Sequence, residues 1–231
     1  MIWLALLLAL LPSWWLMRLF LREDRFPEPR RVVITTFLLG ILIVIPILPI
    51  AFGLMELIPE DAPTWLYGFL SAFLGAAIPE ESLKFLVLTL YCLRHEAFDE
   101  PMDGIVYGVT ASLGFATLEN VLYVSQGGVT VALARAFTAV PMHAFCGVIM
   151  GYNVGRAHLS QGAERRACLW KAILVPIAIH GVYDAPLFMA QTNPDLAVGA
   201  LLAVVVVLIF AWRHSRKVHG HYKRLQARTI R

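Results

Sequence analysis

Charged residues are scarce in this chain: they make up 15% of its 231 residues, whereas 59% are hydrophobic. A soluble domain carries about 25% charged and about 45–50% apolar residues, so the composition excludes an ordinary soluble fold. The mean hydropathy of +0.70 agrees with that exclusion. Alternation of polar and apolar positions is also missing from the apolar stretches. Its absence argues against a β-barrel and favours membrane-crossing helices.

Cysteine is rare as well, and several hydrolase motifs are missing. The three cysteines, Cys92, Cys146 and Cys168, show no metal-binding spacing, so we expect them to pack in or near the spans without a disulfide. The chain has no HExxH helix, no serine elbow and no defensible cysteine–histidine arrangement. Asp184 is the one aspartate deep in an apolar segment, whereas an aspartyl protease pair needs two.

The net charge of +3 does not indicate nucleic-acid binding, because the basic residues form short clusters between apolar runs. The predicted surroundings are a lipid bilayer. We expect an all-α, multi-pass transmembrane bundle of about seven spans in a single integral membrane domain, residues 1–231, which ends in a basic cytoplasmic tail, 213–231. The apolar segments are Ile2–Leu19, Val32–Phe52, Trp65–Leu93, Gly104–Val124, Val129–Val154, Cys168–Ala190 and Leu196–Trp212.

The charges of the connections predict the orientation. The first and fifth connections and the tail are rich in arginine and lysine, whereas the second, fourth and sixth have none. Positive loops face the cytoplasm, so the N-terminus is expected outside and the C-terminus inside. Arg18 and Arg22 follow the first apolar run instead of preceding it, which indicates a retained span and no cleaved signal.

Charged and histidine side chains interrupt four of the apolar segments. A charge in mid-bilayer costs about 2.5–3.5 kcal/mol, so we expect these groups to face one another or a wet cavity. Their positions along the segments place them at similar depths, at about 1.5 Å of rise per residue. They are Glu80, Glu81 and Lys84 in the third segment, Glu119 in the fourth, His143 in the fifth, and His180 and Asp184 in the sixth.

The spacing of the polar residues within each segment predicts which of them contact one another. Glu80 and Lys84 share a helix face at i,i+4, and Glu81 points about 100° away, so we expect only one carboxylate to pair with the lysine. Pro79 cannot donate to the carbonyl of Gly75, which predicts a kink. His180 and Asp184 are also i,i+4, so the aspartate can fix the imidazole tautomer.

Small residues at four-residue spacing mark two helix faces that can approach closely: Gly104, Gly108 and Ser112 on one, and His143, Gly147 and Gly151 on the other. Phe115 and Glu119 share a face, with Asn120 beside them. Arg135 lies near the outer end of its segment, where we expect it to snorkel to the membrane surface.

These residues resemble the PrsW family of bacterial intramembrane proteases, which is related to the CAAX prenyl endopeptidases. The similar segments are EESLK, EPMDGIVYG, GFATLEN, PMH and HGVYD, in that order. They supply Glu80, Glu81, Lys84, Asp103, Gly104, Tyr107, Gly108, Phe115, Glu119, Asn120, His143, His180 and Asp184. The resemblance implies hydrolysis of a peptide bond in a membrane-anchored protein, such as an anti-sigma factor, by a catalytic core of about residues 65–190.

Amide hydrolysis needs an activated water, an oxyanion stabiliser and a proton for the leaving amine. Either Glu80 or Glu81 is the candidate base: the related endopeptidases favour the first, and pairing with Lys84 favours the second. His180, oriented by Asp184, is the candidate for oxyanion stabilisation or proton delivery. Glu119 and His143 would complete the site, and Lys84, Phe115 and Asn120 would support it.

Whether a metal takes part stays open in the sequence. Glu81, Glu119, His143, His180 and Asp184 could bind one divalent ion, and such ligands suit catalytic zinc. Paired glutamates could also activate water unaided. Two other classes of function remain as alternatives: a proton- or cation-coupled transporter, disfavoured because no internal repeat is present, and a non-catalytic membrane scaffold. The short loops suit a bacterial inner membrane, and the sequence does not indicate the oligomeric state.

Overall fold

The computed structural model describes the backbone of residues 2–228 and the side chains from 4 to 224, except those of residues 5, 222 and 223. Within this part of the chain every regular element is helical and no strand occurs, which confirms the predicted all-α class. The α-helices are α1 (Ile2–Glu23), α2 (Arg30–Leu42), α3 (Val44–Met55), α4 (Thr64–Leu70), α5 (Ile78–Leu86), α6 (Pro101–Phe137), α7 (Ala139–Leu159), α8 (Gly162–Thr192) and α9 (Ala197–Arg228). Two π-helices, η1 (Ser71–Ala77) and η2 (Val87–Tyr91), and two 3-10 helices, η3 (Cys92–Arg94) and η4 (Pro194–Leu196), lie between them.

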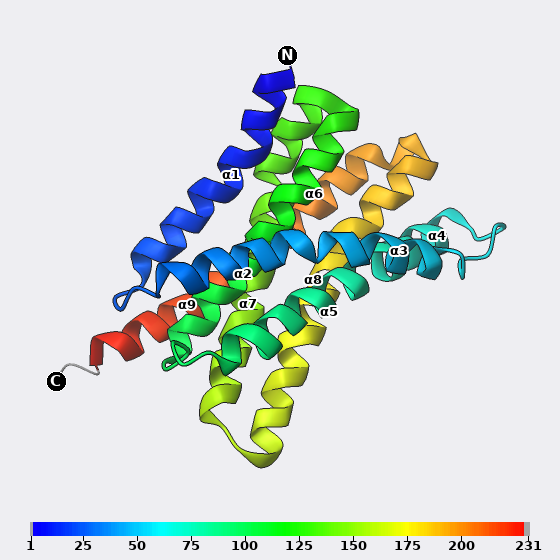
Figure 1. The fold of residues 1–231 in the computed structure, drawn as a ribbon. Helices are drawn as coiled ribbons and strands as arrows, with labels where there is room; N and C mark the ends of the chain where they lie inside the picture. Colours follow the sequence, from blue (N-terminus) through cyan, green and yellow to red (C-terminus); the bar gives the residue numbers. More distant parts are fainter. Residues whose placement is uncertain (1, 229–231) are drawn as a thin grey trace.

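Each predicted apolar segment is helical over most of its length in the described residues. By length and composition, four helical stretches of residues 2–228 can cross a membrane: Arg30–Met55, Pro101–Leu159, Gly162–Thr192 and Pro194–His221. The second stretch contains a break at Gly128, where the backbone leaves helical geometry and the chain turns back on itself (Figure 1). It therefore holds two of the predicted segments.

Helix α9 runs without a break through residue 213, so the predicted basic tail is helical as far as Arg228. Residues 229–231 of the predicted tail lie outside the described part. In Figure 1 the N-terminus and the turn at Gly128 lie at one end of the bundle. The C-terminal end of α9 and the connections from α1 to α2 and from α7 to α8 lie toward the other.

Helix α6 is the centre of the bundle, and every side chain from residue 102 to residue 116 is buried. Helices α1, α2 and α7 all pack against it. The predicted small-residue faces make the α6–α7 contact: a Cβ added to Gly104 would lie 2.3 Å from the carbonyl oxygen of Gly151. A Cβ added to Gly147 would lie 2.7 Å from the carbonyl oxygen of Gly108. The close backbones hold His143, one turn before Gly147, against the centre of the bundle.

The start of α6 is fixed by polar contacts that involve two of the motif residues. Oδ2 of Asp103 accepts from the backbone N–H groups of Asp99 (2.8 Å) and Glu100 (2.7 Å), so this aspartate caps the helix. The Tyr107 hydroxyl donates to the carboxylate of Glu28, which ties α6 to the connection before α2. Asp103 and Tyr107 therefore stabilise the start of α6, and neither of them lines the cavity described below.

Before Pro79, where a kink was predicted, the chain forms the π-helix η1. The Ile78 N–H donates to the carbonyl of Phe73, one residue further back than in an α-helix. Regular α-helix resumes as α5, which places Glu80 and Glu81 in a first helical turn.

Candidate active site

The carboxylates of α5 and Lys84 form the centre of a buried polar cluster. Glu81 and Lys84 have no exposed surface, and Glu80 is 6% exposed. Nζ of Lys84 donates to Oε1 of Glu81 (2.8 Å) and to Oε2 of Glu80 (3.3 Å). The prediction that only one carboxylate could pair with this lysine is therefore wrong. Lys84 is four residues after Glu80 and three after Glu81, and both spacings bring side chains together on a helix surface. Its long side chain therefore reaches both carboxylates.

His180 joins α8 to this cluster. Its Nδ1 lies 2.9 Å from Oε1 of Glu81, and its Nε2 lies 3.1 Å from Oδ2 of Asp184 and 3.8 Å from Oε2 of Glu80. The predicted i,i+4 contact between His180 and Asp184 is confirmed. Because both ring nitrogens face carboxylate oxygens, both contacts are satisfied when each nitrogen carries a proton.

His143 joins α7 to the cluster and has a defined tautomer. Nζ of Lys84 lies 3.1 Å from its Nδ1, and Oε2 of Glu119 lies 2.9 Å from its Nε2. A lysine ammonium has no acceptor, so Nδ1 must accept and Nε2 must donate to Glu119. The Phe115 ring lies edge-on to the imidazole at 5.3 Å and 4.0 Å from Nζ of Lys84, which gives this predicted supporting residue a cation–π contact.

Glu119 and Asn120 form the outer part of the cluster together with Arg135, which was predicted to lie at the membrane surface. Nη2 of Arg135 donates to Oε2 of Glu119 (2.6 Å), and Nε donates to Oδ1 of Asn120 (2.6 Å). The prediction that Arg135 snorkels to the surface is wrong, because its side chain is 14% exposed and bound inside. An arginine in an apolar segment indicates a polar partner. The sequence could not predict that this side chain points inward, because its direction depends on the chain reversal at Gly128.

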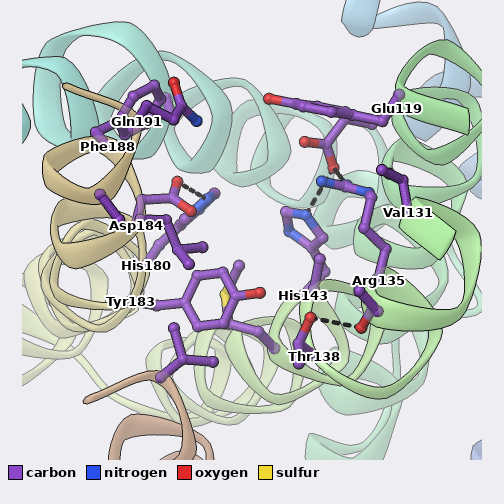
Figure 2. A pocket seen from close by; sticks show the side chains of 18 of the residues that line it. Glu119, Val131, Arg135, Thr138, His143, His180, Tyr183, Asp184, Phe188 and Gln191 are labelled. Carbon is purple, nitrogen blue, oxygen red and sulfur yellow. Dashed lines mark hydrogen bonds and ion pairs between the residues drawn. The ribbon is translucent and has the colours of Figure 1, made fainter. Parts of the chain in front are cut away.

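These residues surround a cavity of about 460 Å³ (Figure 2). Figure 2 shows Glu119, Arg135 and His143 on one wall and His180 with Asp184 on the facing wall. Glu80 also lines the cavity, whereas Glu81 does not. A neighbouring cavity of about 480 Å³, between α3, η1 and α6, shares Glu80 and Glu119 with it and has mostly apolar walls. Of the two carboxylates on α5, Glu80 therefore faces the open space.

The donor atoms fit a metal ion by two observations. Glu80, Glu81, His143 and His180 each offer one ligand atom within 4.8 Å of the others, and Oε2 of Glu81 is buried without a hydrogen-bond partner. If His180 gives up one of its two ring protons, four carboxylates against Lys84 and Arg135 leave two negative charges, which one divalent cation would balance. Two glutamates and two histidines also suit zinc. This group differs from the predicted ligand set: it includes Glu80 and does not include Glu119 or Asp184.

A helical membrane protein with carboxylates and histidines around an internal cavity has the groups that water-dependent hydrolysis needs. Comparison with known proteins specifies the class. Residues 28–212 match the PrsW family intramembrane metalloprotease. The chain belongs to the PrsW family, and it is an intramembrane protease, which decides against the transporter and scaffold alternatives.

Similar proteins from three bacteria cover most of this chain. Protease PrsW of Geobacillus kaustophilus (strain HTA426) is 42% identical over 199 residues, which are 86% of this chain and 83% of that protein. Protease PrsW of Bacillus subtilis (strain 168) is 41% identical over 71% of this chain and 73% of its own. Protease PrsW of Clostridioides difficile (strain 630) is 30% identical over 92% of this chain and 93% of its own. No solved structure matches the chain.

Proposed function

We propose that the cavity between α5, α6, α7 and α8 is the active site, and that it hydrolyses a peptide bond of a membrane-anchored protein. The observation that carries the proposal is the contact of His180 with Glu81 and Asp184 beside the cavity-facing Glu80. Residues 65–190 would form the catalytic core. The remaining helices would hold it in the bilayer.

Glu80 is our choice for the general base. A base must lie within hydrogen-bond reach of the water that it deprotonates, and Glu80 lines both cavities. Glu81 is fully buried, and its Oε1 is already held by Lys84 and His180. Its proposed role is to orient these two cations. This assignment agrees with the preference implied by the prenyl endopeptidases.

His180 is our choice for the group that stabilises the oxyanion or delivers a proton to the leaving amine. Its ring lies at the cavity wall, and Asp184 accepts from Nε2 and orients the imidazole. Glu119 and His143 would shape the opposite wall. If a divalent metal such as zinc is bound, Glu80, Glu81, His143 and His180 would hold it, and it would polarise the scissile carbonyl and acidify water.

The finer predictions on surroundings come from the apolar segments and the charges of the connections, and the prediction on substrate comes from the resemblance to the family. We propose seven spans in a bacterial inner membrane, with the N-terminus outside and the C-terminus in the cytoplasm. The proposed substrate is a single-pass membrane protein, such as an anti-sigma factor. The apolar walls of the second cavity, which include Ile47, Ala51 and Leu122, suit apolar side chains next to the cleaved bond.

A cleavage assay tests the proposal. The wild type, Glu80→Gln and Glu81→Gln would be reconstituted with a panel of single-pass membrane substrates, with and without a chelator. Glu164→Gln is the control, because that carboxylate forms an exposed ion pair with Arg156. We expect cleavage by the wild type and the control, and none by the two folded site variants. Full activity of both site variants would contradict this active site, and chelator sensitivity reversed by one metal would support a metal.

A further inference from the structure

Arg135 is held in the wall of the cavity by three contacts. Its guanidinium donates to Glu119 and to Asn120, both at 2.6 Å. The Tyr123 ring centroid lies 4.1 Å from its Cζ. A guanidinium that binds two side chains through different nitrogens has a defined orientation, which an ammonium in its place would not reproduce.

The contact with Glu119 continues toward the reacting groups. A single oxygen, Oε2 of Glu119, accepts from Arg135 (2.6 Å) and from Nε2 of His143 (2.9 Å). On the other side of that imidazole, Nδ1 accepts from Lys84. Without the guanidinium, the Glu119 carboxylate, which is 15% exposed, would lose its charged partner and be free to rotate away from His143. It would then no longer dictate which nitrogen of His143 carries the hydrogen.

The fold brings Arg135 to this place from a distant part of α6. The chain turns back at Gly128 (Figure 1), and the side chain of Arg135 therefore reaches Glu119 and Asn120. Asn120 is itself anchored, because its Nδ2 donates to the carbonyl oxygen of Ala9 on α1 (3.1 Å). The arginine is thus bound to the first part of α6 and, through Asn120, connected to α1.

We propose that Arg135 is a positioning residue for the protease reaction: it holds Glu119 as the acceptor of the His143 Nε2 hydrogen, which keeps Nδ1 turned toward Lys84 and the paired glutamates. This inference rests on the proposed function of the cavity. It predicts a loss of turnover when the guanidinium is removed, although Arg135 need not touch the reacting bond.

Kinetics of Arg135→Gln and Arg135→Lys test the inference. Loss of a group that orients a site histidine typically lowers activity by about 10- to 100-fold. We expect a fall of this size in kcat for Arg135→Gln, a change in KM of less than about threefold, and partial recovery of kcat in Arg135→Lys. Arg156→Gln is the matched control, because Arg156 pairs with Glu164 on the exposed surface, and we expect it to keep the wild-type kcat.

A double-variant cycle separates positioning from general stabilisation. If Arg135 acts through Glu119, Arg135→Gln should lower kcat no further in a Glu119→Gln background. Nitrogen NMR of histidine-labelled protein, with the His143 signal assigned from its absence in His143→Gln, should show hydrogen on Nε2 in the wild type. It should show a mixture of both tautomers in Arg135→Gln.

Wild-type kcat in folded Arg135→Gln, additive losses in the double variant, or an unchanged His143 tautomer would each overturn the inference. If Arg135→Gln does not fold, Arg135→Lys carries the same three measurements. Failure of the proposed active site gives a different result, namely full cleavage by Glu80→Gln and Glu81→Gln. If those variants are inactive while Arg135→Gln is fully active, only the role of Arg135 is wrong.

Discussion

At the scale of single residues, charge neutralisation explains most of the polar cluster. Lys84 is buried completely, and its three hydrogens are matched by Glu80, Glu81 and His143. A buried ion pair adds little net stability, but the loss of one partner leaves an uncompensated charge in an apolar interior. Lys84 is therefore needed as long as both glutamates stay ionised.

Lys84→Met should destabilise the protein by about 3–5 kcal/mol, the usual cost of breaking a buried pair. Unfolding in mixed micelles, followed by circular dichroism against denaturant, measures the change. Adding Glu81→Gln to Lys84→Met should recover part of the loss, because the uncompensated carboxylate is then removed. Lys171→Met is the control, since Lys171 is exposed on α8. An equal, small effect of both lysine substitutions would refute this account.

At the scale of elements, two kinds of glycine position the site. The first kind lets α6 and α7 touch: a Cβ on Gly151 would lie 1.9 Å from the carbonyl oxygen of Gly104. The second kind lets the chain reverse: Gly128 has φ 64° and ψ −153°, a conformation that only glycine adopts without strain.

Gly151→Ala should lower the free energy of unfolding by about 1–3 kcal/mol, because the added methyl group forces two packed backbones apart. Gly53→Ala is a matched control in an exposed part of α3, where an added Cβ meets nothing within 4 Å. Alanine has the higher helix propensity, so the control should be neutral or slightly stabilising. Thermal unfolding of both variants measures the difference. Equal stability of the two would contradict the close contact between α6 and α7 at Gly151.

Gly128→Ala should destabilise the protein for a different reason. An added Cβ meets no neighbour within 4 Å there, so the cost is backbone strain alone, on the order of 1–3 kcal/mol. We also expect lower cleavage activity, because the reversal places Arg135 beside Glu119. Gly199→Ala serves for comparison, since that glycine is helical and equally open. Unchanged stability and activity of Gly128→Ala would contradict the link between the turn and the site.

At the scale of the whole molecule, the positions of the charged connections predict how the bundle sits in its membrane. The connection near residue 161 is flanked by Arg156, Arg165 and Arg166, whereas the turn near residue 126 contains no base. Positive connections remain in the cytoplasm. The two connections lie at opposite ends of the bundle (Figure 1).

Membrane-impermeant maleimide labelling of intact cells tests this orientation. In a background lacking the three native cysteines, which are buried, Asp61→Cys and Gln126→Cys should be labelled from outside. Gln161→Cys should be labelled only after the cells are opened. Labelling of Gln161→Cys alone in intact cells would reverse the proposed orientation, and labelling of all three would contradict the single span that is predicted between residues 126 and 161.

The sequence by itself determined the helical membrane class, the helical segments and the local pairs. Apolar runs require internally bonded helices in a bilayer, and helical spacing alone brought His180 to Asp184 and aligned Gly104 with Gly108. The motif residues were also sufficient to identify the protease family. These features depend on residues that are close together along the chain or on composition, so no tertiary information was needed.

Only the tertiary structure decided the contacts between helices. His180 meets Glu81 across 99 residues, and Lys84 meets His143 across 59. Arg135 points inward because the chain turns at Gly128, a reversal that a helical wheel cannot represent. Glu80 instead of Glu81 faces the cavity for a similar reason, since rotation of α5 depends on what packs against it. The residues of the proposed site were candidates on the sequence alone, whereas the contacts between them depended on packing.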